Sequence, residues 1–459
     1  MPAEVTRRLA EFAVSTRFEA MAPEVRAQAR MAIIDSIGTV LAGTGQESVG
    51  ILRDFARGES AAGGATVLGC GMKMTASNAA FVNAAAAHAL DYDNISLTVS
   101  GFVTTPILFA LLGVAEEEGG VCGRDLLEAF IVGYEFEAAV ARGLGVYHYA
   151  NGWHSTATLS HFGATVAVAR LLKFDVERMR HAIGITASEV SGLRTMVGNM
   201  LKAFHVAKAA RNGITAARLA QRGFTGHTAV MEADWGFCNA VNGKGHYDLD
   251  AMLSNLGDPY DLVNPGLVIK VYPCCGLIHS ALDGVLDLMH KHGIAAGQVR
   301  RARLAVHELV PPTMKNDDPR TGYQGKFSTP FCVATALSEG SVRLRHFTDA
   351  RVTDPAIREI MSRVEMVVHP DLHGYDMFLQ KEFSDVRLEL TDGRTVEQRV
   401  MRINNRGSMG RPVSSAELRE KYADCVSGYA DQPAAMKAFS LIENLEALSD
   451  VREITALLR

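Results

Sequence analysis

The sequence contains no run of about 18 consecutive apolar residues, the length at which a segment predicts a membrane-spanning helix. Its first residues mix charges of both signs, where a secretory signal peptide has a positive end and then a clean apolar run. A net charge of -5 gives no general attraction to nucleic acid or to an anionic membrane. We therefore expect a cytoplasmic protein that has neither nucleic acid nor membrane as a partner.

Motifs that hold metals or nucleotides are also missing. The seven cysteines are odd in number and scattered, which argues against a disulfide framework. There is no CxxC, no HExxH and no closely spaced cysteine and histidine quartet, so neither zinc nor an iron–sulfur cluster has a visible ligand set. Glycine-rich nucleotide-binding motifs are absent as well. We expect reduced cysteines and no bound metal.

The composition is that of an ordinary globular protein, with 48% hydrophobic and 21% charged residues. A chain of 459 residues exceeds what one core usually supports, so two domains are expected. In the first part of the chain, apolar residues recur at three- and four-residue spacing, as in LLEAFIVGYEFEAAVARGL. This spacing predicts packed helices.

The pattern changes after Pro265. RRARLAVHELV alternates like a strand, and FSDVRLELTDGRTVEQRVMRI is two alternating runs joined by Asp392-Gly393, a strong hairpin signal. KFSTPFCVATALSEG and DPAIREIMSRVEMVV are predicted as helices between them, and the tail returns to helix. We expect a mainly α fold, with an all-helical domain of residues 1–266 and 405–459 and a smaller α+β domain of residues 267–404.

The first candidate site is HALDYDN, which ends an alanine-rich helix and carries His88, Asp91 and Asp93. Two carboxylates beside a breaking helix can face one cavity, and one of them can act as a base if burial raises its pKa. In the alternative, the aspartates cap the next turn, and His88 is a core residue whose ring nitrogens have hydrogen-bond partners. Taken alone, the motif favours this alternative.

The second candidate is GWHSTAT, which contains His154 and Thr158 and precedes a helix of small residues. Backbone N–H groups and the dipole at a helix N-terminus favour an anion, which suits a carboxylate substrate. Ser155 or Thr156 as an ordinary N-cap accounts for the hydroxyls equally well. His154 is therefore the informative residue.

The third candidate is LKAFHVAKAARNG, which has a basic side chain at every third position and no acidic residue among them: Lys202, His205, Lys208 and Arg211. Such a stripe on a helix indicates a site for a multiply charged anion, with lysine or histidine also available for proton transfer. The alternative is pairing with acids of another helix. The sequence does not decide between the two.

Two further candidates follow the change in pattern. KVYPCCGLIH brings Lys270, Cys275 and His279 to the domain boundary, where ligand sites are common. Lys270 can bind a carboxylate, whereas buried apolar packing is the first interpretation of the cysteines. A loop with Arg320 and Lys326 before FSTPF can close over an anion, or it can be a solvated turn.

In their order, these segments resemble the MmgE/PrpD family, together with GYE, GFTG, GKFSTPF and the late SAELREKYADC. The family includes 2-methylcitrate dehydratases, cis-aconitate decarboxylases and an iminodisuccinate epimerase. The resemblance implies a large all-helical domain with a smaller α+β lid, a homodimer and no cofactor. It also implies a small polycarboxylate as substrate.

The resemblance carries the family's catalytic pocket onto Asp91, His154, Lys202 and Lys270. Together with the motifs above, it predicts a second group of side chains that contact the substrate: His88, Phe102, Thr158, His205, Lys208, Cys275, His279, Lys326 and Phe331.

The sequence departs from the family pattern at three of these positions. Phe102 stands near the place of a histidine in dehydratase and decarboxylase members, Phe331 replaces a tyrosine, and Cys275 replaces a histidine as in the epimerase-like branch. We expect a lyase that dehydrates or decarboxylates a small di- or tricarboxylic acid by proton transfer at carbon. The alternatives are an epimerase of a dicarboxylate such as iminodisuccinate, and a non-catalytic carboxylate-binding or scaffold protein.

Overall fold

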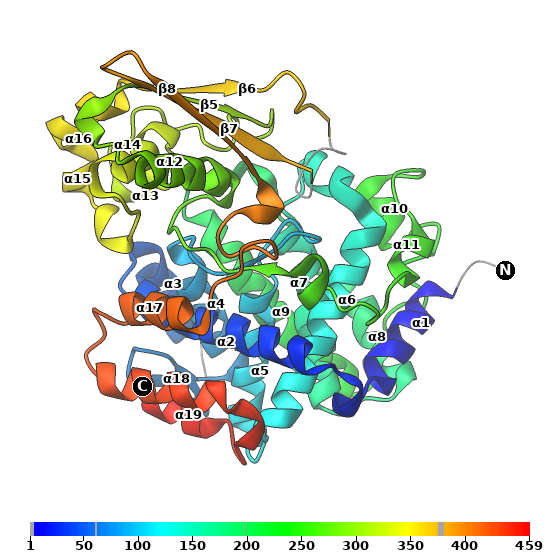
Figure 1. Cartoon of the computed structure of the whole chain (residues 1–459). Coiled ribbons are helices and arrows are strands. Elements are labelled where there is room, and N and C mark those ends of the chain that lie inside the picture. Colours follow the sequence, from blue (N-terminus) through cyan, green and yellow to red (C-terminus); the bar gives the residue numbers. More distant parts are fainter. Residues whose placement is uncertain (1–3, 60–61, 197, 375–380) are drawn as a thin grey trace. The chain divides into compact units, whose positions relative to one another are not determined.

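The computed structural model describes residues 4–59, 62–196, 198–374 and 381–459. The chain divides into two compact units (Figure 1). Unit 1 is built from Met1–Ala89, Asp93–Leu267 and Ser415–Arg459, and unit 2 from Leu90–Tyr92 and Val268–Ser414. The domain limits predicted from the sequence remain a prediction, because a division by contacts does not show which segments fold independently.

Unit 1 is mainly helical, as predicted. Its α-helices are α1 (Val5–Ser15), α2 (Pro23–Gly43), α3 (Glu47–Glu59), α4 (Ala76–Ala89), α5 (Thr104–Glu118), α6 (Gly123–Ala150), α7 (Ser155–Leu171), α8 (Val176–Ala187), α9 (Leu201–Gln221), α10 (Phe237–Asn242), α11 (Leu249–Leu253), α17 (Ser415–Cys425), α18 (Gln432–Glu443) and α19 (Arg452–Leu457). In the part of the chain that the structure describes, none of the helices combines the length and apolar character needed to cross a membrane.

The predicted mainly α fold is confirmed, and unit 1 also contains short strands. Strands β1 (Ala65–Val67) and β2 (Met72–Met74) form a short antiparallel pair within unit 1. The very short strands β3 (Ile95–Ser96) and β4 (Leu267–Val268) also occur. Three-residue strands carry too little alternation to stand out in a sequence.

Small residues bring the central helices of unit 1 close together. A Cβ on Gly213 of α9 would lie 2.5 Å from the Cβ of Ala164 on α7. A Cβ on Gly133 of α6 would lie 2.6 Å from the carbonyl oxygen of Gly163, also on α7. Both distances are too short for non-bonded atoms, so glycine allows α6 and α9 to pack tightly on α7. The same helices position the polar residues described below.

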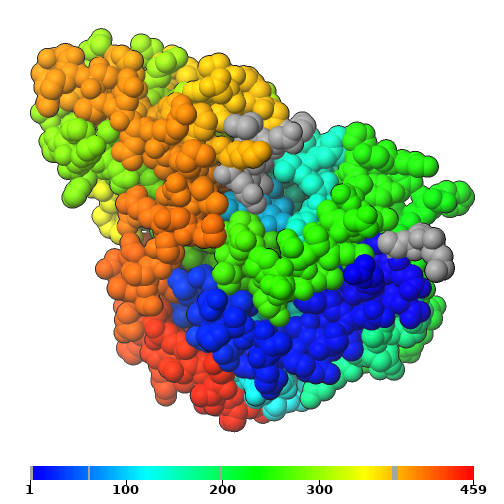
Figure 2. All heavy atoms as spheres, turned by 45° about the vertical axis from the view of Figure 1, so that its right-hand side comes forward, coloured from blue at the N-terminus to red at the C-terminus, as the bar shows by residue number. Residues whose placement is uncertain are grey.

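The C-terminal helices pack beside the N-terminal α2, as the red and blue segments show (Figures 1 and 2). Lys421 of α17 forms a buried ion pair with Asp35 of α2, with Nζ 2.5 Å from Oδ1. Burial raises the pKa of Asp35, although the ion pair with Lys421 opposes this. The helical tail is thus a part of unit 1.

Unit 2 contains a four-stranded sheet with the order β6-β5-β7-β8. Its strands are β5 (Val299–Val306), β6 (Val364–Val368), β7 (Phe383–Leu390) and β8 (Thr395–Met401); β6 is parallel to β5, and the other pairs are antiparallel. The α-helices are α12 (His279–His292), α13 (Gly322–Gly325), α14 (Thr329–Glu339), α15 (Asp349–Thr353) and α16 (Pro355–Met361), and α12 packs on β7 and β8.

Two sequence-based predictions in unit 2 have different outcomes. The hairpin at Asp392-Gly393 is confirmed, because β7 and β8 pair antiparallel on either side of this turn. The other edge of β7 pairs with β5, where Leu390 lies opposite Val299. The predicted helix DPAIREIMSRVEMVV ends at Met361, and its second half is strand β6. Pairing with β5 overrides the local preference there, because β6 pairs along its whole length with β5 on one side.

Candidate active site

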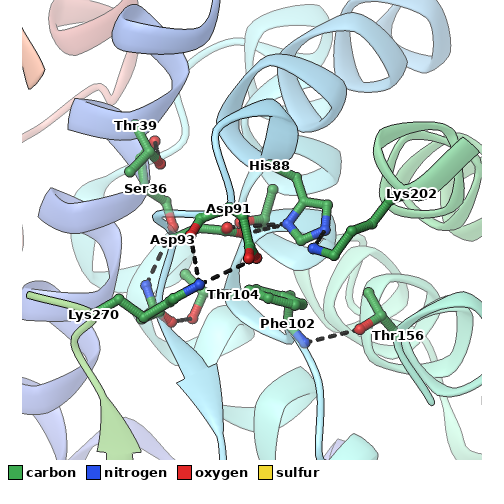
Figure 3. A network of polar contacts seen from close by, with 12 residues as sticks. Ser36, Thr39, His88, Asp91, Asp93, Phe102, Thr104, Thr156, Lys202 and Lys270 are labelled. Atoms are coloured by element: carbon green, nitrogen blue, oxygen red, sulfur yellow. Dashed lines mark hydrogen bonds and ion pairs between the residues drawn. The ribbon is translucent and has the colours of Figure 1, made fainter. Parts of the chain in front are cut away.

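Three buried side chains of unit 1 form a linear polar chain (Figure 3). Nδ1 of His88, near the end of α4, lies 3.0 Å from both carboxylate oxygens of Asp93. Nε2 of the same ring lies 2.6 Å from Nζ of Lys202 on α9. Because a carboxylate accepts and an ammonium donates, we assign the hydrogen of a neutral His88 to Nδ1. Asp93 thereby orients an imidazole that accepts from Lys202.

The segment after α4 is held in place by hydroxyl groups of α5. Oγ1 of Thr105 donates to Oδ2 of Asp93 at 2.9 Å, and Oγ1 of Thr104 donates to Oδ1 of Asn94 at 2.6 Å. The side-chain amide of Asn94 donates in turn to Asp35 at 3.1 Å. The alternative in which the aspartates only cap a turn therefore does not describe Asp93, because its carboxylate orients His88.

Phe102 forms an apolar wall beside this chain (Figure 3). Its ring centroid lies 4.2 Å from that of His88, edge to face, and Nζ of Lys202 lies 4.3 Å from the Phe102 centroid. The backbone N–H of Phe102 donates to Oγ1 of Thr156 at 2.9 Å, and its carbonyl accepts from Oγ of Ser160 at 3.3 Å. A cation on an aromatic face is stabilised by the ring quadrupole. The ring therefore helps to position the ammonium.

A pair of histidines belongs to the same region of unit 1. Nδ1 of His154 lies 3.1 Å from Nδ1 of His205, which is one turn beyond Lys202 on α9. His154 occupies the N-cap position of α7, but no side-chain capping hydrogen bond is formed there. The interpretation of Thr156 as an ordinary cap is wrong, since its hydroxyl binds Phe102.

The predicted basic stripe on α9 is divided. Lys202 and His205 contact the buried histidines, whereas Nζ of Lys208 donates to the carbonyl oxygen of Ser191 at 2.7 Å. The guanidinium of Arg211 lies over the ring of Phe81, 4.6 Å from its centroid. Successive members are three residues apart, which is less than the roughly 3.6 residues of a full turn, so the stripe rotates out of the site.

Thr158 is held away from this cluster. Its hydroxyl lies 2.8 Å from Nε2 of His148, whose Nδ1 lies 2.9 Å from Oδ1 of Asn242. Burial lowers the pKa of His148 to about 4, so the ring is neutral near pH 7. This arrangement indicates a structural role, and a substrate contact of Thr158 remains a prediction.

Unit 2 contains a second cationic cluster. Nζ of Lys270 lies 2.5 Å from the carbonyl oxygen of Asp91 and 3.1 Å from its carboxylate. Asp91 has a φ of 51°, a left-handed conformation that aspartate tolerates better than most residues. Nζ of Lys326 donates to the carbonyl of Pro273 at 2.7 Å, and burial lowers the pKa of Lys326 to about 8. Lys270 thus holds Asp91 by backbone and side chain together.

The cysteines near Lys270 are buried, as the apolar interpretation predicted. Burial raises the pKa of Cys275 to about 11. The pKa of Cys274 is instead lowered to about 5, because hydrogen bonds with Cys332 and His279 and the charge of Lys270 outweigh burial. Nε2 of His279 lies 3.3 Å from the carbonyl oxygen of Cys274. No pattern in the sequence indicated the hydrogen bond between the free cysteines Cys274 and Cys332.

Phe331 lies inside an apolar cluster of unit 2 that includes Val352 and Ile357. The ring is fully buried and packs edge to face on Phe347, with centroids 5.6 Å apart. A ring in this position contributes to the core of the unit. Its predicted contact with a substrate remains a prediction.

The cluster of unit 1 combines an ammonium group with imidazoles that can carry protons. A buried cation binds a carboxylate more strongly than an exposed one does, because water screens it less. Across the described ranges, no group of three or more His, Cys, Asp or Glu side chains could hold a metal ion. The arrangement thus suits carboxylate binding and proton transfer by side chains.

Comparison with known proteins agrees with this chemistry. The model of the MmgE/PrpD N-terminal domain matches residues 7–250, and that of the MmgE/PrpD C-terminal domain matches residues 272–447. A cis-aconitate decarboxylase of Homo sapiens is 24% identical over 452 residues, 93% of this chain and 89% of the relative. One of Aspergillus terreus is 24% identical over 417 residues, 86% of this chain and 84% of the relative.

Decarboxylases are carbon–carbon lyases, so these relatives support a lyase at the level of the family. The two domain models follow each other along the chain in the order that the sequence motifs predicted. The chain belongs to the MmgE/PrpD family.

Proposed function

We propose that the chain is a lyase that decarboxylates a small unsaturated di- or tricarboxylic acid, with cis-aconitate as the first compound to test. The observation that carries the proposal is the buried chain from Asp93 through His88 to Lys202. It holds an ammonium group in one orientation against Phe102, where a substrate carboxylate can bind. The named activity of the decarboxylase relatives supports the same reaction.

In the proposed reaction, Lys202 binds a carboxylate next to the reacting carbon. The bond to the departing carboxylate breaks, CO2 leaves, and the electron pair spreads over the neighbouring double bond toward the bound carboxylate. Lys202 stabilises this charge. Protonated His154 then delivers a proton to carbon and takes one back from solvent. Both His154 and Lys202 are catalytic residues in this proposal.

Phe102 argues against dehydration, although the decarboxylases of the family also have a histidine near its place. Loss of water requires an acid that protonates the departing hydroxyl, and a phenyl ring cannot donate that proton. The carboxyl group leaves as CO2 and needs no such acid. The ring next to Lys202 and His88 is thus compatible with the proposed reaction.

A second candidate is an epimerase of a dicarboxylate. The observation that favours it is the presence of two separate pairs of side chains that contain imidazole in unit 1. One pair is His88 with Lys202, and the other is His154 with His205. Epimerisation removes a proton from one face of a carbon and returns it to the other, which is most simply done by two such groups.

The test is product analysis in D2O with cis-aconitate, 2-methylcitrate and iminodisuccinate. Decarboxylation predicts CO2 release and one deuterium at the protonated carbon of the product. Epimerisation predicts deuterium uptake without loss of CO2, and dehydration predicts loss of water from 2-methylcitrate. Binding of these acids without any turnover would support the scaffold alternative and overturn the proposal.

Lys270 and Lys326 of unit 2 are proposed as further carboxylate ligands. Each is buried and contacts a backbone carbonyl oxygen. Their roles are tested independently of the unit 1 residues, by the effect of Lys270→Met and Lys326→Met on KM.

The expected homodimer is tested by sedimentation of the full chain.

A further inference from the structure

The contact between His154 and His205 restricts where hydrogen atoms can lie. The two Nδ1 atoms are 3.1 Å apart, which is a hydrogen-bonding distance. A hydrogen on neither atom leaves two lone pairs facing each other, and a hydrogen on both produces a clash. One hydrogen therefore lies between the two rings.

Tight packing keeps the pair in this arrangement. The backbone N–H of His154 donates to the carbonyl oxygen of Gly192 at 3.1 Å. Gly192 has a φ of 147°, and a Cβ there would lie 2.3 Å from the Cβ of Ala157 and 3.2 Å from Cε1 of His205. No side chain fits at this position, so the backbone closes directly against the second ring.

Burial keeps His205 neutral near pH 7. Burial lowers the pKa of His205 to about 4, and the positive charges of Lys208 and Lys202 lower it further. His161 of α7 also interacts with His205, and its own pKa is lowered to about 3, mainly by burial. His205 therefore does not compete with His154 for a proton near pH 7.

His154 can gain and lose a proton and still keep its hydrogen bond to His205 only if this bond runs in one direction. If Nδ1 of His154 donates, Nε2 is the nitrogen that gains and loses a proton, and the bond to His205 persists in both states. In the opposite direction, Nδ1 of His154 accepts from His205, and a proton can be added only by breaking that bond.

We propose that His205 is a positioning residue that accepts the Nδ1 hydrogen of His154 and so makes Nε2 of His154 the nitrogen that exchanges protons with substrate carbon. This role rests on the proposed lyase function. It differs from the predicted role of His205 as a substrate contact, because His205 acts through His154.

The test compares His205→Leu with His205→Asn, whose side-chain oxygen can replace Nδ1 as the acceptor. We expect His205→Leu to lower kcat for CO2 release about 10²-fold with little change in KM, within the usual range for acid–base catalysis. His205→Asn should retain most of the activity. The pH at which activity changes should also move lower in His205→Leu, because the imidazolium of His154 loses its acceptor.

Nitrogen-15 NMR of labelled histidine gives a readout that does not depend on turnover. At a pH where His154 is neutral, we expect its hydrogen on Nδ1 in the unmodified protein. In His205→Leu it should move to Nε2, the position preferred by free histidine, while His205→Asn keeps it on Nδ1. Equal tautomers in all three proteins, or a hydrogen on Nε2 in the unmodified protein, would overturn the assignment.

His154→Ala separates the failure of this inference from failure of the proposed function. Full CO2 release by His154→Ala would overturn the role of His154 as proton donor, and with it the catalytic consequence of the pair. Loss of activity in His154→Ala together with full activity in His205→Leu would overturn only the positioning role. The melting temperature of each variant shows whether it is folded.

Discussion

Nζ of Lys202 lies 2.6 Å from Nε2 of His88, so this imidazole accepts a hydrogen bond from the ammonium group and is neutral while it does so. Protonation of His88 would place two positive charges in contact. The carboxylate of Asp93 on Nδ1 orients the ring for this contact. The position of the proposed carboxylate-binding group therefore depends on a histidine three residues before the predicted catalytic Asp91.

Lys202→Met is expected to lower kcat/KM for the true substrate at least 10²-fold, roughly the effect of losing one group that stabilises transition-state charge. Methionine keeps most of the shape, so the melting temperature should change by only a few degrees. Lys244→Met, at an exposed lysine of the same unit, is the control. Near-normal activity of Lys202→Met would show that the site is misplaced.

Phe102 predicts poor dehydration of 2-methylcitrate, because no proton donor stands at its position next to Lys202. Steady-state rates for 2-methylcitrate and cis-aconitate, measured with the same preparation, compare the two reactions. Dehydration at a rate typical of enzymes, on the order of 10 per second, would mean that another residue supplies the acid.

The ion pair of Lys270 with Asp91 is buried, and removal of one partner leaves the other charge without compensation. We expect Lys270→Met to lower the free energy of unfolding by about 3 to 5 kcal/mol. Urea unfolding of Lys270→Met, of Asp91→Asn and of the double variant measures the coupling energy between the two side chains. If the losses of unfolding free energy in the single variants add up to that of the double variant, the ion pair contributes no coupling and the prediction is wrong.

Glu137 of α6 provides a prediction about pH. Burial raises its pKa to about 8, and the hydrogen bond from Ser160 at 2.7 Å only partly opposes this. Since the pKa in the folded state exceeds the ordinary 4.5, the folded state binds more protons between these values, and stability falls as the pH rises from about 4.5 through 8.

Glu137→Gln cannot ionise and should lose this part of the pH dependence. Relative to the unmodified protein, the variant should gain roughly 4 kcal/mol of unfolding free energy between pH 5 and pH 9. Urea unfolding at the two pH values measures this, and Glu177→Gln, at an exposed glutamate, is the control. Parallel pH profiles of variant and unmodified protein would refute the shift.

Activity should survive exhaustive treatment with a chelator, since neither the sequence motifs nor the described side-chain clusters supply a metal-ligand set. Metal analysis before and after treatment accompanies the assay. A stoichiometric transition metal that is lost together with activity would disprove this prediction.

Local patterns in the sequence were sufficient for much of the fold. The apolar spacing of the segment that forms α6 predicted a helix, and alternation with Asp392-Gly393 predicted the hairpin of β7 and β8. These features depend on neighbours in the chain, so the sequence shows them directly. The order of the motifs likewise indicated the family that the domain models match.

Other features depend on residues far apart in the sequence. VEMVV became strand β6 because β5 offered a parallel partner. The basic stripe of α9 was visible in the sequence, but packing against α4 and α7 decided that Lys202 and His205 contact the buried histidines while Lys208 binds Ser191. The sequence determined which residue types are present and their local periodicity. Only tertiary structure decided which of them meet, because hydrogen bonds and burial depend on distances in space.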